Sequence, residues 1–135
     1  GVLDHLPMLY DRLTVEENLH FFAKVYSIPD FGNQIDYWVD KLELNKHLNH
    51  KIHHLSHGFQ KRVGLARSLM HNPQILLLDE PETGLDQKSL EIFFSILGDF
   101  LNNGGCAIVA THNDFKMLEK FSLNFLIEKN RLIQQ

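Results

Sequence analysis

The sequence has one cysteine, no surplus of positive charge and no long apolar segment, and each absence argues against a class of protein. Because Cys106 is the only cysteine, the chain cannot form an internal disulfide, which fits a reducing compartment such as the cytosol. The 13 Lys and Arg against 17 Asp and Glu give a formal net charge of −4, whereas a dedicated nucleic-acid-binding protein carries a basic surplus. We therefore expect no nucleic-acid partner. No uncharged apolar run approaches the roughly 18 residues that a membrane-spanning helix needs.

The sequence also lacks a P-loop, the phosphate-binding motif G-x-x-x-x-G-K-[ST], in which a second glycine stands five positions after the first and precedes Lys and Ser or Thr. None of the 8 glycines stands at that distance from another. The chain begins at Gly1, with an apolar pair directly after it, rather than at a methionine with a polar tail. We therefore expect a fragment or a processed product of a longer protein.

What the 135 residues do contain is the pattern of one α/β domain, which no repeat, low-complexity tract or linker divides. A capping box at Thr14 and Glu17 precedes apolar residues at helical spacing, and a second amphipathic segment follows at 35–42. Residues 45–55 are polar and rich in histidine, which is typical of a loop. Ser56 is placed to cap a further helix that runs to about residue 71.

Buried strands alternate with helices in the second half of the chain. Residues 75–78 and 106–110 are apolar runs, and we expect the first to be buried on both faces of a parallel sheet. An amphipathic helix at about 90–101 lies between them, and a short helix at 114–120 precedes a third strand at 124–128. This order predicts a parallel sheet covered by helices. Ligands of such sheets bind at the carboxyl ends of the strands.

Polar residues follow two of these strands. Asp79 and Glu80 end the first strand, and Thr111 and His112 end the second. An aspartate there can hold Mg²⁺, a neighbouring carboxylate can deprotonate a water, and a histidine on the same edge can donate to a developing phosphate charge. Residues 56–58 open a helix, where free amides can bind an anion. Each of these features also has a purely structural explanation. Acidic residues often end a strand before a turn, a histidine can hydrogen-bond to a neighbouring backbone group, and a serine can cap a helix without binding a ligand.

In order along the chain, LSHGFQKR at 55–62, LLLDEP at 76–81, TGLD at 83–86 and TH at 111–112 resemble the ATP-binding-cassette (ABC) ATPases. They are similar to the signature motif, the Walker B strand, the D-loop and the switch histidine of that family. The segment LYDRLTVEENL at 9–19 is similar to the region that follows the family's Q-loop. The resemblance spans essentially the whole chain.

The resemblance implies that residues 1–135 are the C-terminal part of an ABC nucleotide-binding domain, with the α/β fold of P-loop NTPases. About 13–71 would form an inserted helical subdomain, and about 72–135 would belong to the RecA-like core. The family binds ATP and Mg²⁺, pairs with a second ATP-binding subunit and docks on transmembrane transporter subunits. The implied location is peripheral, on the cytoplasmic face of the inner or plasma membrane. Without a P-loop, we expect this chain alone not to hydrolyse ATP.

Carried over residue by residue, the resemblance implies that Asp79 supports Mg²⁺, that Glu80 is the catalytic base and that His112 is the γ-phosphate switch. His5 stands where the family has the Q-loop glutamine, which faces the metal ion. A histidine at this position is similar to the haem-exporter ATPases of cytochrome c maturation, so haem export is the narrower expectation. The Gly-Leu-Asp of the D-loop, in contrast, is common across transporters generally.

The signature-like segment departs from the family pattern at His57 and Phe59, where Gly and Gln are usual. Ser56 and Gly58, which face phosphate in the family, are present. The resemblance implies that this segment closes on ATP held by the opposite subunit and that Asp86 links the two sites.

Two other functions stay open. A soluble ABC ATPase of DNA repair or translation would share these motifs, although FFAKVY at 21–26 is typical of transporter subunits. A metal-binding module would use a cluster of imidazoles, which bind Zn²⁺, although the lone cysteine lies far away in the sequence. The candidate ligands for such a module are His47, His50, His53, His54 and His57.

Overall fold

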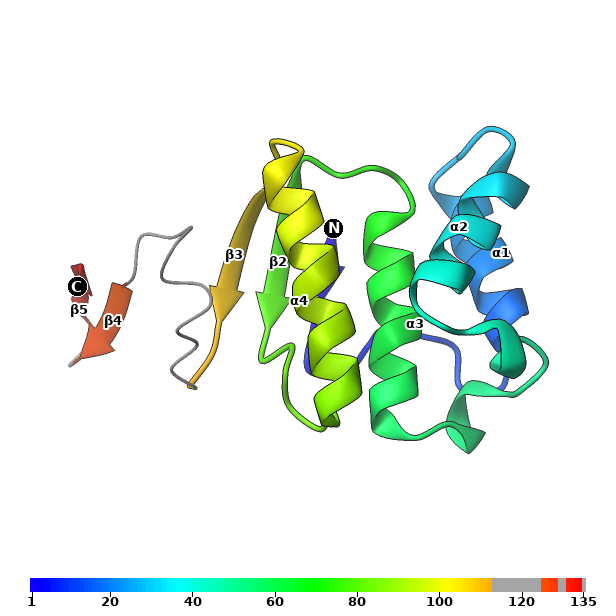
Figure 1. Ribbon diagram of the computed structural model, residues 1–135, viewed down its shortest axis with the longest axis horizontal. Helices are drawn as coiled ribbons and strands as arrows, with labels where there is room; N and C mark the ends of the chain where they lie inside the picture. The colour runs from blue at the N-terminus through cyan, green and yellow to red at the C-terminus, as the bar shows by residue number, and fades with distance from the viewer. Residues whose placement is uncertain (113–124, 129–130, 135) are drawn as a thin grey trace.

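The computed structural model describes residues 1–112, 125–128 and 131–134 (Figure 1). The predicted helix at 114–120 lies outside the described residues. The elements follow in the order β1 (Val2–Leu3), α1 (Val15–Val25), α2 (Phe31–Lys41), η1 (Asn45–His47), η2 (Ile52–His54), α3 (His57–Leu69), β2 (Ile75–Asp79), α4 (Gln87–Asn102), β3 (Cys106–Ala110), β4 (Phe125–Glu128) and β5 (Arg131–Gln134).

Three strands form a parallel sheet in the order β1-β2-β3. Leu77 of β2 lies between Val2 and Ile108 of the flanking strands, and Asp79 at the end of β2 pairs with Ala110. The predicted parallel sheet is therefore confirmed. The pattern had not indicated β1, because two residues are too few to display an alternation.

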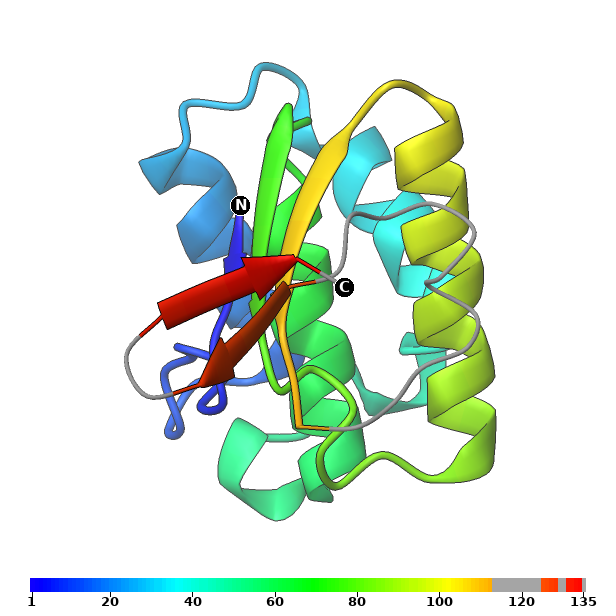
Figure 2. The same cartoon turned by 90° about the vertical axis from the view of Figure 1, so that its left-hand side faces the viewer.

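The described helices cover one face of the sheet (Figures 1 and 2). Leu76 and Leu78 are 1% and 3% exposed and belong to the core on this side, whereas Ile75 and Leu77 are 55% and 43% exposed. The prediction that this strand is buried on both faces is wrong for the described residues. Successive side chains of a strand point to opposite faces, and the face that carries Ile75 and Leu77 has no described helix over it.

Of these helices, α1 and α2 form an outer layer beyond α3, on the side away from the sheet (Figure 1). α1 begins at the predicted capping box, in which the Glu17 amide donates to Thr14 Oγ1 at 3.1 Å and the Thr14 amide to Glu17 Oε2 at 2.8 Å. The histidine-rich segment forms the two short 3₁₀ turns η1 and η2, anchored by the buried side chain of Ile52. No described helix is long and apolar enough to cross a membrane.

The predicted third strand exists as β4, but its pairing differs from the prediction. β4 pairs antiparallel with β5, and Phe125 lies opposite Gln134 in this two-stranded sheet. Apolar character located the strand but could not choose its partner, because β5 was not recognised in the sequence.

Candidate functional site

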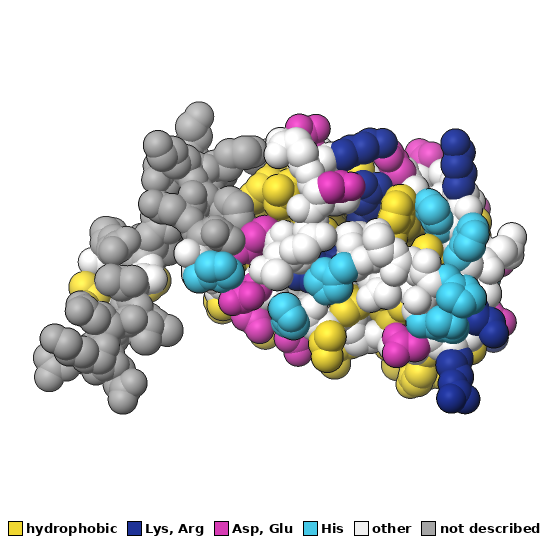
Figure 3. Space-filling view, turned by 90° about the horizontal axis from the view of Figure 1, so that it is seen from below, with side chains coloured by type: hydrophobic (Ala, Val, Ile, Leu, Met, Phe, Trp, Pro, Cys, Tyr) yellow, Lys and Arg dark blue, Asp and Glu magenta, His cyan; other side chains and the backbone are white. Residues whose placement is uncertain are grey.

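The carboxyl ends of β2 and β3 bring Glu80 and His112 together. Because Asp79 pairs with Ala110, the residues that follow the two strands leave the sheet side by side. Nδ1 of His112 lies 3.1 Å from Oε1 of Glu80. Figure 3 looks onto this end of the molecule, where histidine and acidic side chains lie next to one another.

A second imidazole reaches the same carboxylate from the segment after β1. Nδ1 of His5 lies 4.0 Å from Oε2 of Glu80, and both side chains are partly open to solvent. The backbone amide of His5 donates to Oδ1 of Asp4 at 2.6 Å. Glu80 therefore has His5 at one oxygen and His112 at the other. At this exposure solvent screens the charges, so the contacts orient the carboxylate more than they stabilise the fold.

The backbone of Glu80 is held in an uncommon conformation. Its φ is +41°, in the left-handed region that a residue with a side chain rarely adopts. The Glu80 amide donates to the Ala110 carbonyl at 2.8 Å, and the Thr83 amide donates to the Glu80 carbonyl at 3.2 Å. The ammonium of Lys61 also donates to that carbonyl, at 2.5 Å.

Lys61 is a residue of this site that the sequence had not indicated. It lies on α3, is 2% exposed and is surrounded by the carboxylates of Asp79, Glu80 and Glu82. Burial lowers the pKa of Lys61, and these negative charges oppose the shift. Its position near the end of the signature-like segment was the only available signal, and that position does not reveal a contact with the residue that follows β2.

The signature-like segment forms the beginning of α3. Ser56 is the N-cap, and its Oγ accepts from the Phe59 amide at 3.4 Å. Ser56 is exposed, whereas Gly58 is buried against the turn that follows β2, where a Cβ would meet Ser89 Oγ at 3.5 Å and the Gly84 carbonyl at 3.7 Å. The first turn of α3 thus presents an exposed hydroxyl and helix N-terminal amides, which together can bind an anion.

His57 packs directly on Gly84. A Cβ at Gly84 would lie 2.3 Å from Nδ1 of His57, and the φ of Gly84 is +76°. The ring of His57 is 6.1 Å from that of His5, centroid to centroid. Burial lowers the pKa of His57, and the positive charges of Lys61 and His5 lower it further. The two histidines that depart from the family pattern are therefore neighbours.

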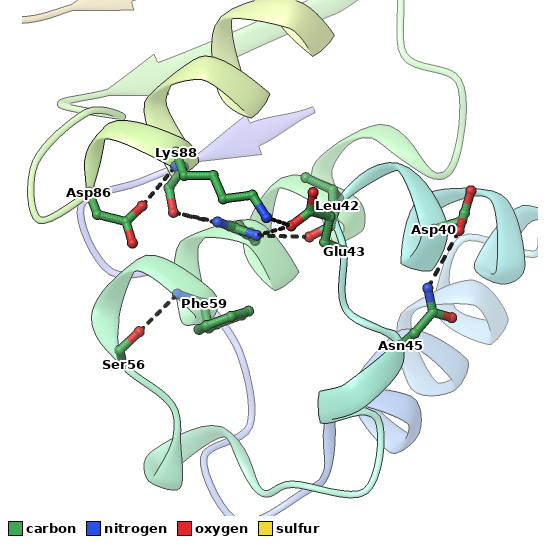
Figure 4. Close-up of polar contacts among 10 residues, drawn as sticks. Asp40, Leu42, Glu43, Asn45, Ser56, Phe59, Asp86 and Lys88 are labelled. Carbon is green, nitrogen blue, oxygen red and sulfur yellow. Dashed lines mark hydrogen bonds and ion pairs between the residues drawn. The ribbon is translucent and has the colours of Figure 1, made fainter.

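Asp86 caps the helix after this turn. Its Oδ1 accepts from the Ser89 amide at 2.7 Å, and the hydrogen bonds from Ser89 lower the pKa of the Asp86 carboxyl (Figure 4). Ser89 Oγ in turn accepts from Arg62 at 2.8 and 3.1 Å, and the Arg62 guanidinium lies 3.7 Å from Glu43. α3 and the start of α4 are thereby tied together.

A magnesium nucleotide is the group that such a site would hold. The exposed carboxylate of Asp79, at the end of β2, has the oxygen chemistry that Mg²⁺ prefers. Among the described residues, however, no three His, Cys, Asp or Glu side chains gather to hold a metal ion. Asp79 could contribute one oxygen ligand to a metal ion, but the described residues do not complete a metal site by themselves.

The histidines of η1 and η2 do not form a metal centre. His47 packs near Phe59, with ring centroids 4.1 Å apart and the rings tilted by 47°, and Nδ1 of His53 donates to the Asp11 carbonyl at 2.7 Å. His53 and His54 are close, at 4.1 Å between centroids, but no third ligand joins them in the part of the chain that the structure describes. The geometry gives no support to the metal-binding module.

Comparison with known proteins supports one family. The family model described as ABC transporter matches residues 1–83. The chain is 37% identical over 115 residues to the cytochrome c biogenesis ATP-binding export protein CcmA of Paracoccus denitrificans, which is 85% of this chain and 53% of that protein. It is 37% identical over 87 residues to the ABC transporter ATP-binding protein NatA of Bacillus subtilis, which is 63% of this chain and 35% of that protein. The chain thus spans only about half the length of CcmA.

Solved structures give the same result for the fold. The dimeric post-hydrolysis state of the ATP-binding cassette MJ0796, bound to ADP and Pi, matches with a TM-score of 0.73 and 31% identity, over 84% of this chain and 52% of that one. The structure of cbiO1 from Clostridium perfringens, part of the ABC transporter complex cbiONQ, matches with a TM-score of 0.77 and 27% identity. That match covers 98% of this chain and 55% of the other. The predicted fold class is confirmed.

Proposed function

This chain belongs to the ABC transporter family, and we propose that it is the C-terminal part of the nucleotide-binding domain of a subunit that hydrolyses ATP to drive transport. The observation that carries the proposal is the 3.1 Å contact between Glu80 and His112, next to Asp79 at the carboxyl edge of the sheet. Residues about 13–71 would be the helical subdomain, and about 72–135 would belong to the RecA-like core.

Glu80 would act as the base that takes a proton from the attacking water. Its carboxylate is oriented by His112 and lies near His5, and its backbone is fixed by hydrogen bonds on both sides. Positioning and electrostatic stabilisation supply most of the catalysis in phosphoryl transfer. As an imidazolium, His112 donates from both ring nitrogens, so it would bridge Glu80 and the γ-phosphate.

Asp79 would hold Mg²⁺, usually through a water molecule, and His5 would face the same ion from the Q-loop position. When bound, Mg²⁺ neutralises charge on the phosphates. The P-loop that cradles the phosphates is absent from this sequence, so we propose that a longer protein supplies it.

Ser56, His57 and Gly58 would bind the ATP of a second ATP-binding subunit. The exposed Ser56 hydroxyl and the amides of the first turn of α3 support this role, because a helix N-terminus favours phosphate. Asp86 would link the two sites from the turn on which Gly58 packs. Transmembrane transporter subunits would be the other partners, and they would place the protein at the cytoplasmic face of the membrane.

The proposed activity is tested in the longer protein that contains a P-loop. Glu80→Gln is expected to abolish ATP turnover while nucleotide binding remains, because the amide keeps the shape of the carboxylate and cannot accept the proton. Glu91→Gln is the matched control, since Glu91 is exposed on α4 and its carboxylate contacts Gln87. Wild-type turnover in Glu80→Gln would contradict the proposal. The isolated 135-residue chain is expected to show no turnover above its own Glu80→Gln variant.

Haem export is the narrower proposal. It is supported by two relatives described as cytochrome c biogenesis export proteins, at 37% and 34% identity, and by His5 at the Q-loop position. Deletion of the gene is expected to remove haem-stained c-type cytochromes and to spare b-type cytochromes. Unchanged c-type cytochromes would assign the subunit to another transporter, and recovery of RNA or DNA rather than membrane subunits in a pull-down would favour a soluble ABC ATPase.

A further inference from the structure

Lys61 is a buried ammonium whose position the proposed function does not explain. Its side chain is 2% exposed, and its Nζ donates to the backbone carbonyl of Glu80 at 2.5 Å. Burial of a charged amine is unfavourable unless the amine is paired and hydrogen-bonded. The contact therefore requires a reason beyond packing.

The acceptor of this hydrogen bond is one of six described non-glycine residues with a positive φ. Glu80 has a φ of +41°, and a non-glycine residue persists in this region only where its surroundings fix it. The Glu80 amide donates a hydrogen bond to the Ala110 carbonyl of β3 at 2.8 Å. On the other side, the Glu80 carbonyl accepts from Nζ of Lys61 on α3 and from the Thr83 amide at 3.2 Å. Of these three contacts, only the one from Lys61 comes from a helix that is distant in the sequence.

We propose that Lys61 is a positioning residue, which keeps Glu80 in the left-handed conformation that directs its carboxylate to His112. The claim that this carboxylate acts on water rests on the proposed function, whereas the claim that Lys61 fixes the backbone does not. α3 begins at the Ser56 cap. A displacement of that segment would therefore reach Glu80 through the same hydrogen bond.

A structural role alone is the competing explanation, because Lys61 also lies among the carboxylates of Asp4, Asp79 and Glu82. Arg67 provides the matched control. It is a second buried cation of α3, 4% exposed, and its guanidinium donates to the Val2 carbonyl at 2.6 Å. Its loss removes a comparable buried hydrogen bond to a backbone carbonyl without affecting a bond to Glu80.

The kinetic experiment uses the longer protein that contains a P-loop. Lys61→Met is expected to lower kcat by about 100-fold, as expected for a displaced catalytic group, with little change in KM for ATP. Lys61→Gln, which keeps an N–H donor, recovers part of the loss, and Arg67→Met keeps kcat near wild type.

Hydrogen exchange tests the backbone claim independently of catalysis. Lys61→Met is expected to speed amide exchange at Glu80 and in residues 82–85 more than Arg67→Met does. Equal exchange in the two variants, or an equal fall in kcat, overturns the positioning role. If the wild-type protein binds ATP without hydrolysing it, the proposed function fails, and faster exchange in Lys61→Met still supports the contact between Lys61 and Glu80.

Discussion

Gly84 and His57 approach so closely that the helix carrying the signature-like segment and the turn after β2 fit together only without a side chain at Gly84. A Cβ there would lie 2.3 Å from the imidazole Nδ1, and the φ of +76° disfavours any L residue. The contact joins the segment proposed to bind one nucleotide to the turn that carries Asp86, proposed to link the two sites. The close contact between His57 and Gly84 thus couples the signature-like segment to the turn after β2.

Gly84→Ala is expected to lower the free energy of unfolding by about 1–3 kcal/mol, the cost of a strained backbone position, with the overlap adding to it. Urea unfolding measures this change. Gly98→Ala is the matched control, because Gly98 lies within α4 and an added Cβ would meet no atom within 4 Å apart from its own chain neighbours and the adjacent helix backbone. This control is expected to stabilise the protein by about 0.5–1 kcal/mol. In a His57→Gly background the cost of Gly84→Ala is expected to fall, and an unchanged cost would contradict the contact.

Asp86→Ala is expected to shift the urea midpoint of unfolding downward, because it removes the carboxylate that accepts from the Ser89 amide at the start of α4. Asp86→Ser keeps a capping oxygen and is expected to restore most of the midpoint. The pair separates the cap from the proposed link between sites, because only the link requires the carboxylate. If Asp86→Ser unfolds as early as Asp86→Ala, the cap is not what stabilises α4.

The sequence patterns that predicted the fold correctly each lie within a single short segment of the chain. The capping box at Thr14, the Ser56 cap and the apolar run of β2 all occur within a few residues, so they could be recognised without tertiary structure. The contact between Glu80 and His112 followed from the topology, since neighbouring parallel strands end at one edge.

Other features depend on the approach of distant segments. The hydrogen bond from Lys61 to the Glu80 carbonyl exists only because α3 packs against the turn after β2. The exposure of Leu77 depends on what covers the second face of the sheet, and the pairing of β4 depends on a strand whose pattern was too weak to recognise. Spacing along the chain does not report these relationships.

Acidification is expected to destabilise the folded protein through His57. Burial, Lys61 and His5 lower the pKa of His57 in the folded state, so the unfolded chain binds a proton first, near the ordinary histidine value of about 6.5. Stability is therefore present above about pH 6.5 and is lost as the pH falls below it towards the folded pKa. Urea unfolding from pH 8 to 5 should show this fall, and His57→Asn should reduce its slope. Parallel curves for wild type and variant would exclude His57 as a cause.

The contact between His112 and Glu80 gives a kinetic prediction for the longer protein that contains a P-loop. His112→Ala is expected to lower kcat by about 100-fold or more, the range for loss of one transition-state donor. ATP binding should change little, because His112 is exposed at the edge of the site and is proposed to act when charge develops on the γ-phosphate. His50→Ala, in the exposed loop after η1, is the matched control and is expected to keep wild-type turnover. Turnover and nucleotide affinity are measured on the same preparations. Comparable kcat in the two variants would remove His112 from the reaction and leave its 3.1 Å contact with Glu80 as a structural one.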